Sequence, residues 1–186
     1  MTGVTIKLLE SDSPGFKALQ RLGAAARDQS PAWEAIGENL VITTKQRFSS
    51  QTGPDGRRWP PNTQTTIIRY LQGFKGSFSK KTGKILKAGS DRASAKRPGI
   101  GESRQLATEI VRRHNATGVV VGSPMIYAGT FQFGARKGAY GKMSNGAPIP
   151  WGDIPPRPFI GLDERDETMI VDTVADFLEQ TAQGRQ

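Results

Sequence analysis

Few residues of this chain are of the types that do chemistry at a catalytic or metal site. The sequence has one histidine, His114, and no cysteine, so it excludes thiolate chemistry and any metal site built on cysteine or several histidines. The neighbours Arg112 and Arg113 are basic, and no carboxylate pattern marks a general-base partner. We therefore predict that His114 lies in a solvated turn, and that the protein has no catalytic residue, metal or cofactor.

A glycine-rich stretch superficially resembles a phosphate-binding loop. It reads G-A-R-K-G-A-Y-G-K from Gly134 to Lys142. The phosphate loop of nucleotide-binding proteins ends in Gly-Lys-Ser/Thr and opens a helix, whereas Met143-Ser144-Asn145-Gly146 follow here. We expect no nucleotide site at this stretch, and a hydrolase is disfavoured because no nucleophile–base pair is visible.

Charge is the strongest chemical signal in the sequence. The formal net charge is +9 and the pI is about 10.1. Between Leu40 and Ile100 there are 13 basic and two acidic residues, whereas from Gly161 onward seven carboxylates accompany two arginines. A basic middle and an acidic tail could steer a nucleic acid, or let copies of the protein meet head to tail.

The basic middle includes residues 72–100, which are rich in glycine, serine and lysine. We predict a long solvated loop there, partly disordered when the protein is alone. Its basic residues are candidates to face DNA in a channel: Lys75, Lys80, Lys81, Lys84, Lys87, Arg92, Lys96 and Arg97. Tyr70, Phe74 and Phe78 interleave them as stacking aromatics would. No helix-turn-helix or zinc-finger signature is present, so the alternatives are non-specific phosphate contacts or ordinary solvated lysines.

Length and composition bound the architecture. With 186 residues, the chain is long enough for one well-cored domain, so we expect a single domain over 1–186 with extended loops at about 72–100 and 135–150. No apolar run reaches the length of a membrane span, and no signal peptide is visible at the N-terminus. The sequence therefore predicts a soluble protein that is not exported.

Helical periodicity marks four segments. Apolar residues at three- and four-residue spacings predict a short amphipathic helix from Phe16 that ends near Arg27. Ser30-Pro31 supplies an N-cap and a first-turn proline for a long helix whose stripe ends at Phe48, with members Trp33, Ile36, Leu40, Val41 and Thr44. Residues 62–71 form a weaker candidate helix, capped by Thr63. The last helix begins near Asp163, where carboxylates suit the helix dipole, and its stripe is Ile170, Val171, Val174, Phe177 and Leu178.

Alternation of apolar and polar residues marks three strands. They lie at residues 3–9, within Thr108–Arg113 and at Gly118–Val121, with residues 114–118 as a hairpin connection. The predicted fold class is α+β: a small antiparallel β-sheet packed against a long central helix and a C-terminal helix, with long Gly/Lys-rich loops.

Two segments combine aromatic anchors with a stiff backbone. Trp59 precedes paired prolines, and we predict that it folds back onto the preceding helix. Arg157 lies between two prolines, which would present its guanidinium from a rigid arm. Arg157, Phe159, Tyr127 and Phe131 are therefore candidates for an interface. A buried Phe159 that anchors the last helix is the alternative.

Four blocks of sequence follow one another over most of the chain. They are I-G-E-N-L-V-I-T-T-K-Q-R-F-S-S-Q-T-G-P-D-G-R-R-W-P-P (Ile36–Pro61), G-E-S-R-Q-L-A-T-E-I (Gly101–Ile110), V-V-V-G-S-P-M-I-Y-A-G-T-F-Q-F-G (Val119–Gly134) and I-P-P-R-P-F-I-G-L (Ile154–Leu162). Four blocks in this order are specific. In them the chain resembles the phage virion morphogenesis family, the tail completion proteins of Mu-like and P2-like contractile-tailed phages.

The resemblance implies a small α+β structural protein of the head–tail junction (neck) of the virion, with no reaction of its own. It would complete the tail so that the tail can join a DNA-filled head, as a homo-oligomeric ring that analogy makes sixfold. Its other partners would be the connector, tail terminator and tail tube proteins and, non-specifically, phage DNA, but no membrane. Assembly would take place in the bacterial cytoplasm. The alternative is a basic, non-specific nucleic-acid-binding accessory protein.

Overall fold

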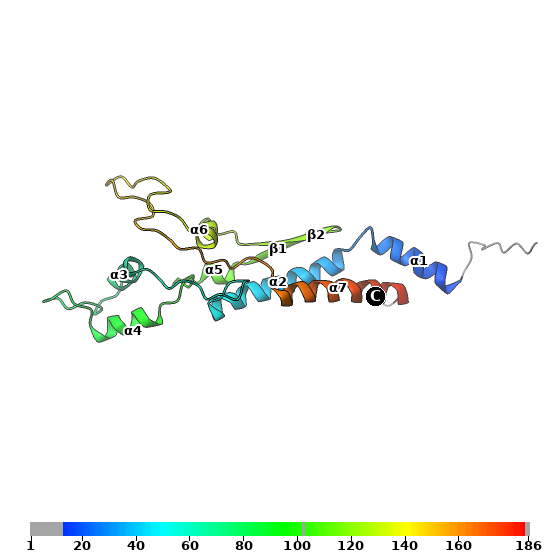
Figure 1. Cartoon of the computed structure of the whole chain (residues 1–186), viewed down its shortest axis with the longest axis horizontal. Coiled ribbons are helices and arrows are strands. Elements are labelled where there is room, and N and C mark those ends of the chain that lie inside the picture. The colour runs from blue at the N-terminus through cyan, green and yellow to red at the C-terminus, as the bar shows by residue number, and fades with distance from the viewer. Residues whose placement is uncertain (1–12, 102, 185–186) are drawn as a thin grey trace, which may run out of the picture. The chain divides into compact units, whose positions relative to one another are not determined.

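The structure is a computed structural model that describes residues 13–101 and 103–184 (Figure 1). This part of the chain contains seven helices and one two-stranded antiparallel sheet, which confirms the predicted α+β class. The chain divides into two compact units. Unit 1 comprises Met1–Asn39, Arg112–Val120 and Glu164–Gln186, and unit 2 comprises Leu40–Val111 and Val121–Asp163. The expectation of a single domain stays a prediction.

Unit 1 is built on the helices α1 (Pro14–Ala25) and α7 (Glu164–Gln183), which pack against each other. Helix α1 begins two residues before the predicted Phe16, and Ser13 caps it because its Oγ accepts a hydrogen bond from the Phe16 amide at 3.3 Å. Arg21 of α1 donates to the Thr181 and Ala182 carbonyls at 3.0 and 2.6 Å. The Arg21 guanidinium donates hydrogen bonds to carbonyls at the C-terminal end of α7, and its positive charge interacts favourably with the negative end of the helix dipole. Hydrogen bonds and electrostatics therefore hold the two helices together in addition to side-chain packing.

The hairpin consists of β1 (Val111–Asn115) and β2 (Gly118–Gly122), and it confirms the predicted strand pair. Its turn is shorter than predicted: the Asn115 side chain accepts from the Thr117 amide at 2.9 Å. The prediction that His114 lies in the turn is therefore wrong, because this exposed residue belongs to β1. The predicted strand at residues 3–9 lies outside the described residues.

The long helix α2 (Ser30–Ser50) begins and ends where the sequence predicts. In unit 1, Arg112 of the hairpin forms ion pairs with two glutamates of α2, with Glu38 at 2.6 Å and with Glu34 at 3.4 Å. From Leu40 onward α2 belongs to unit 2. The predicted combination of a long central helix, a C-terminal helix and a small sheet is thus present.

Unit 2 also contains α3 (Gln64–Gln72), α4 (Lys87–Ala95), α5 (Gln105–Thr108) and α6 (Ala128–Phe133). Helix α3 has the predicted cap, since Thr63 Oγ1 accepts from the Thr66 amide at 3.3 Å. Helix α4 was not predicted, so the prediction of a loop over residues 72–100 is wrong for Lys87–Ala95, whereas residues 73–86 and 96–100 have no helix or strand. Helix α4 packs on α3 and lacks an apolar stripe. A small residue makes the contact of α4 with the segment at Ser77, because a β-carbon at Gly89 would clash with the Ser77 carbonyl oxygen.

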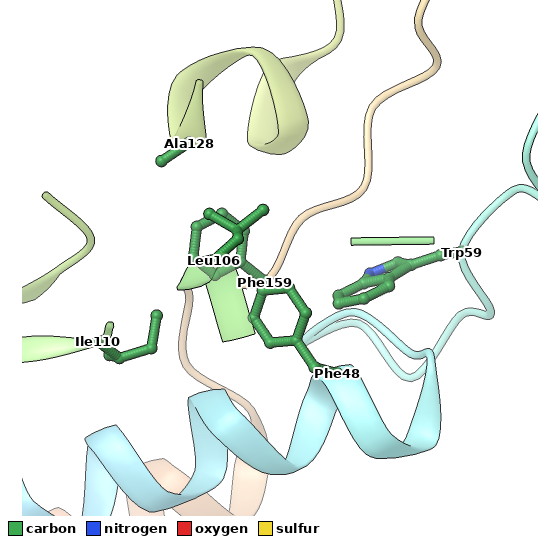
Figure 2. Packing of buried hydrophobic residues seen from close by; sticks show 6 residues of the cluster. All are labelled: Phe48, Trp59, Leu106, Ile110, Ala128 and Phe159. Carbon is green, nitrogen blue, oxygen red and sulfur yellow. The ribbon is translucent and has the colours of Figure 1, made fainter. Parts of the chain in front are cut away.

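An aromatic cluster forms the core of unit 2. Phe48 from α2 lies with its ring 5.2 Å from the rings of Trp59 and Phe159, and Phe131 from α6 lies 5.2 Å from Trp59. Figure 2 shows Phe48, Trp59 and Phe159 together with the other buried members of the cluster, Leu106, Ile110 and Ala128. The prediction that Trp59 folds back onto the preceding helix is confirmed.

The first testable prediction concerns Gly99, whose φ is +73°. A β-carbon there would lie 2.7 Å from Phe131 Cζ and 2.9 Å from Phe48 Cε1. We expect Gly99→Ala to lower the free energy of unfolding by about 2–4 kcal/mol, because it adds a clash with the rings to the backbone cost of positive φ. The measurement is urea denaturation followed by tryptophan fluorescence.

The matched control is Gly76→Ala. Gly76 has φ +78° but nothing within 4 Å of a β-carbon, so this variant carries the backbone cost alone. Equal losses in the two variants would show that the aromatic cluster does not crowd Gly99.

Candidate assembly surface

The segment from Arg157 to Asp163 has no regular secondary structure, and side chains bind its backbone. Arg47 of α2, which is only 5% exposed, donates from Nη1 to the Phe159 and Gly161 carbonyls at 3.1 and 2.8 Å. Its Nη2 forms an ion pair with Asp163 at 3.3 Å. One guanidinium therefore fixes three points of the segment, and the planar fork of arginine suits such a task.

Gln132 and Trp59 bind the same segment from other sides. The Gln132 side-chain oxygen accepts from the Phe159 and Ile160 amides at 2.9 and 3.1 Å, and its Nε2 donates to the Ile160 carbonyl at 2.9 Å. Trp59 Nε1 donates to the Pro158 carbonyl at 2.8 Å. These bonds satisfy backbone groups of a segment that lies outside any strand or helix. Sequence reasoning missed Arg47 and Gln132, because polar residues within apolar patterns carry no signal of their role.

Arg157 points inward. It is 5% exposed, and it donates from Nε and Nη2 to the Pro60 and Pro61 carbonyls, both at 2.8 Å. Burial lowers the pKa of its guanidinium from the ordinary value, but an arginine remains protonated at neutral pH. The rigid Pro-Arg-Pro setting thus holds the side chain against another proline pair instead of presenting it to a partner.

The four candidate interface residues lie close together, but mostly in the interior: the Phe131 ring lies 5.9 Å from the Phe159 ring and 5.7 Å from the Arg157 guanidinium carbon, and its amide donates to the Tyr127 carbonyl at 3.0 Å. Phe159 is fully buried, and Phe131 packs against the same cluster. For Arg157 and Phe159 the direct interface contact that we predicted is wrong, because neither side chain is accessible; the alternative of a buried, anchoring Phe159 describes the structure. Only Tyr127 is exposed, at 45%.

Tyr127 belongs to a patch that sequence reasoning largely missed. We call it the α6 patch: Ile126, Tyr127, Phe133 and Tyr140. Ile126 is 99% exposed, Phe133 78% and Tyr140 56%. Together with Gly129, Thr130 and Gly134 they line an open hollow of about 520 Å³. Exposed apolar side chains that gather in this way commonly mark a contact with another protein.

The α6 patch is held in place by the residues beneath it. Helix α6 carries Phe131 and Gln132 toward the interior and Phe133 outward. Tyr140, from the glycine-rich loop, is tied to α6 because its hydroxyl lies 2.6 Å from Thr130 Oγ1. That loop is a ribbon, with antiparallel bridges between Ala135 and Ile154 and between Lys142 and Pro148. The patch therefore combines apolar exposure with a fixed backbone.

The basic candidates divide into two groups. Six are exposed: Lys75, Lys80, Lys81, Lys84, Lys87 and Arg97. Arg92 and Lys96 are half-buried and support the fold. Arg92 donates to Ser77 Oγ at 3.2 Å, and Lys96 donates to the Ile100 carbonyl and lies 4.7 Å from the centre of the Tyr70 ring. Whether the exposed group contacts DNA stays a prediction.

A second hollow lies beside this group. We call it the basic groove; it encloses about 470 Å³ and is lined by Ser49, Tyr70, Lys96, Arg97, Ile100 and Arg104, with Ala95 and Gly101. Arg104 was not among the predicted residues, since it follows the stretch that the charge count singled out. The groove thus gathers three cations together with the side chains of Tyr70 and Ile100.

Among residues 13–101 and 103–184, no group of three or more histidine or carboxylate side chains could hold a metal ion. Within the same residues, no helix is both long and apolar enough to cross a membrane.

Residues 15–179 match the phage virion morphogenesis family. Because this match covers most of the chain, the protein belongs to that family, and its role lies in the assembly of phage particles. It is similar to a protein of Escherichia phage Mu named "Putative capsid assembly protein G", with 29% identity over 159 residues that cover 84% of this chain and 83% of that protein. No solved structure matches the chain.

The second prediction tests the inward orientation of Arg157. We expect Arg157→Ala to lower the free energy of unfolding by about 2–3 kcal/mol, because it removes two charge-assisted hydrogen bonds from a buried position. Arg58→Ala, at an exposed arginine, is the control and should change stability by less than about 0.5 kcal/mol. Thermal and urea unfolding provide the measurement. An Arg157→Ala protein with wild-type stability that fails to assemble would return Arg157 to the interface.

Proposed function

We propose that this protein is a non-enzymatic structural component of the head–tail junction, where it completes the tail as one subunit of an oligomeric ring. The observation that carries the proposal is the α6 patch. A protein that joins other proteins needs a fixed apolar surface that stays uncovered until assembly, and Ile126 and Phe133 provide large side chains of this kind.

The distribution of charge supports the same proposal. The sequence of unit 2 contains 18 basic and six acidic residues, whereas that of unit 1 contains eight basic and 11 acidic residues. The two units therefore carry opposite net charges, which favours contacts between unlike surfaces of neighbouring copies.

The family and the relative in phage Mu support a role in particle assembly in general. The relative's name concerns the capsid, and the family motifs resemble tail completion proteins. The head–tail junction is the place in a virion where both structures meet, so a junction component accommodates both indications.

A basic nucleic-acid-binding accessory protein remains the second candidate function. The observation that favours it is the group of six exposed basic side chains between Lys75 and Arg97. Binding to non-specific duplex DNA by a monomer, with affinity that falls steeply as salt rises, would support this candidate.

The third prediction tests the proposed location. Quantitative mass spectrometry of purified virions should give a small fixed number of copies per particle, equivalent to one ring, against the copy number of the tail tube protein. Immunogold electron microscopy should place these copies where head and tail meet. Absence from mature particles, or label over the whole head or tail, would contradict the proposal.

The fourth prediction tests the α6 patch. A lysate of a mutant phage that lacks this protein should accumulate separate heads and tails, and added wild-type protein should join them. We expect the double variant Ile126→Ser/Phe133→Ser to fold normally but to restore at least about tenfold fewer infectious particles, since interface centres carry most of the binding energy. Ile42→Ser, at a 52% exposed residue of α2 outside the patch, is the matched control. Full activity of the patch variant would show that the patch is not the joining surface.

A further inference from the structure

Two charged surfaces of this chain remain unassigned after the α6 patch is given its role. The first is the basic groove of unit 2. Its cations are held in different ways: Arg97 reaches the Ser49 carbonyl at 3.5 Å, and Lys96 is fixed by Ile100 and Tyr70. Arg97 and Arg104 are exposed, so their charges remain available to a partner.

The second is the solvent side of α7 in unit 1, which we call the acidic face. Its exposed carboxylates are Glu164, Glu167, Asp172, Asp176 and Glu179. At 100° per residue they occupy one side of the helix together with the exposed Arg165, opposite the buried Asp166. Val171 lies within this face and is 66% exposed, so the acidic face also has an apolar element.

We propose that the acidic face of α7 in one copy binds at the basic groove of a second copy. This inference rests on the proposed function as a ring subunit, and it identifies the two surfaces through which neighbouring copies would bind each other. Carboxylates of the face would meet Arg97 and Arg104, and the apolar Val171 would meet Ile100. Because the two surfaces differ, the contact is heterologous, and repetition of a heterologous contact generates a ring or a filament and not a closed dimer.

Two observations favour a second copy over DNA as the occupant. Every copy that carries the groove also carries the acidic face, so the complementary surface is present at equal concentration. The groove is lined by Ile100 and Tyr70 as well as by its cations, and the acidic face matches them with Val171. The phosphate backbone of a duplex presents charge without a matching apolar element.

The experiment uses complementary charge reversals in the full-length protein. Variant one is Arg97→Glu/Arg104→Glu, and variant two is Asp172→Lys/Asp176→Lys. Lys96 is left unchanged because it supports the fold. Sedimentation velocity at low salt measures self-association, and circular dichroism verifies folding. The control Lys80→Glu/Lys81→Glu makes the same change of net charge at exposed residues outside the groove.

We expect wild-type protein and the control to self-associate at low salt and to dissociate as salt rises, since screening weakens contacts between exposed charges. Each reversed variant alone should associate about 100-fold more weakly, because like charges would face each other. An equimolar mixture of the two should recover association, since alternating copies restore opposite charges at every contact. One chain that carries all four substitutions should recover it as well.

Three results would overturn the inference: a wild type that stays monomeric at low salt, reversed variants that associate normally, or a mixture that fails to recover association. Normal association of variant one together with lost binding to duplex DNA would identify the groove as a nucleic-acid site. These outcomes are separate from the location test. A protein found at the head–tail junction whose variants associate normally keeps its proposed function and loses this contact.

Discussion

The structure of unit 2 depends on side chains that bind the backbone of a segment without secondary structure. Residues 157–163 bury Phe159 completely. The Arg157 amide bonds the Phe131 carbonyl of α6 at 2.8 Å, but among the described residues backbone partners do not supply the hydrogen bonds of residues 158–161. Arg47, Gln132 and Trp59 make those bonds instead, from segments far apart in the sequence. Leaving buried backbone groups unpaired would cost about 1–3 kcal/mol each, so the aromatic cluster can close around Phe159 only because these three side chains are in place.

The same constraint explains why four separate sequence blocks identify the family. The first block supplies Arg47, Phe48 and Trp59, and the second supplies Leu106 and Ile110. Phe131 and Gln132 come from the third block, and Arg157 and Phe159 from the fourth. The blocks are therefore pieces of one interior, joined by rings and by hydrogen bonds. The third block also contains Ile126, Tyr127 and Phe133 of the α6 patch, so the segment that supplies Phe131 and Gln132 to the interior supplies most of the proposed joining surface as well.

Periodicity predicted the elements whose apolar residues are large and regularly spaced. Helices α1, α2 and α7 and the hairpin β1–β2 belong to this group. Helix α4 escaped prediction because small residues such as Gly89 make its contact with the Ser77 segment. The inward orientation of the Arg157 side chain was not predicted either, because two flanking prolines restrict the backbone but do not indicate which side of it faces the interior. Sequence reasoning found Tyr127 but not Ile126, Phe133 and Tyr140, because apolar residues are assigned to a core by default and only packing shows which ones remain outside.

In the proposed assembly, two contacts of different physical kinds act together. Exposed ion pairs are individually weak, about 0–1 kcal/mol, and salt screens them, so the groove and the acidic face alone would hold copies together only loosely at cellular ionic strength. The α6 patch adds an apolar contact that salt does not screen. A copy that binds through its patch raises the local concentration of its acidic face beside the next groove, which strengthens the second contact without any new interaction. The ring would then form at the protein surface that binds the α6 patch. Free subunits would stay dispersed because their net charge of +9 makes them repel one another.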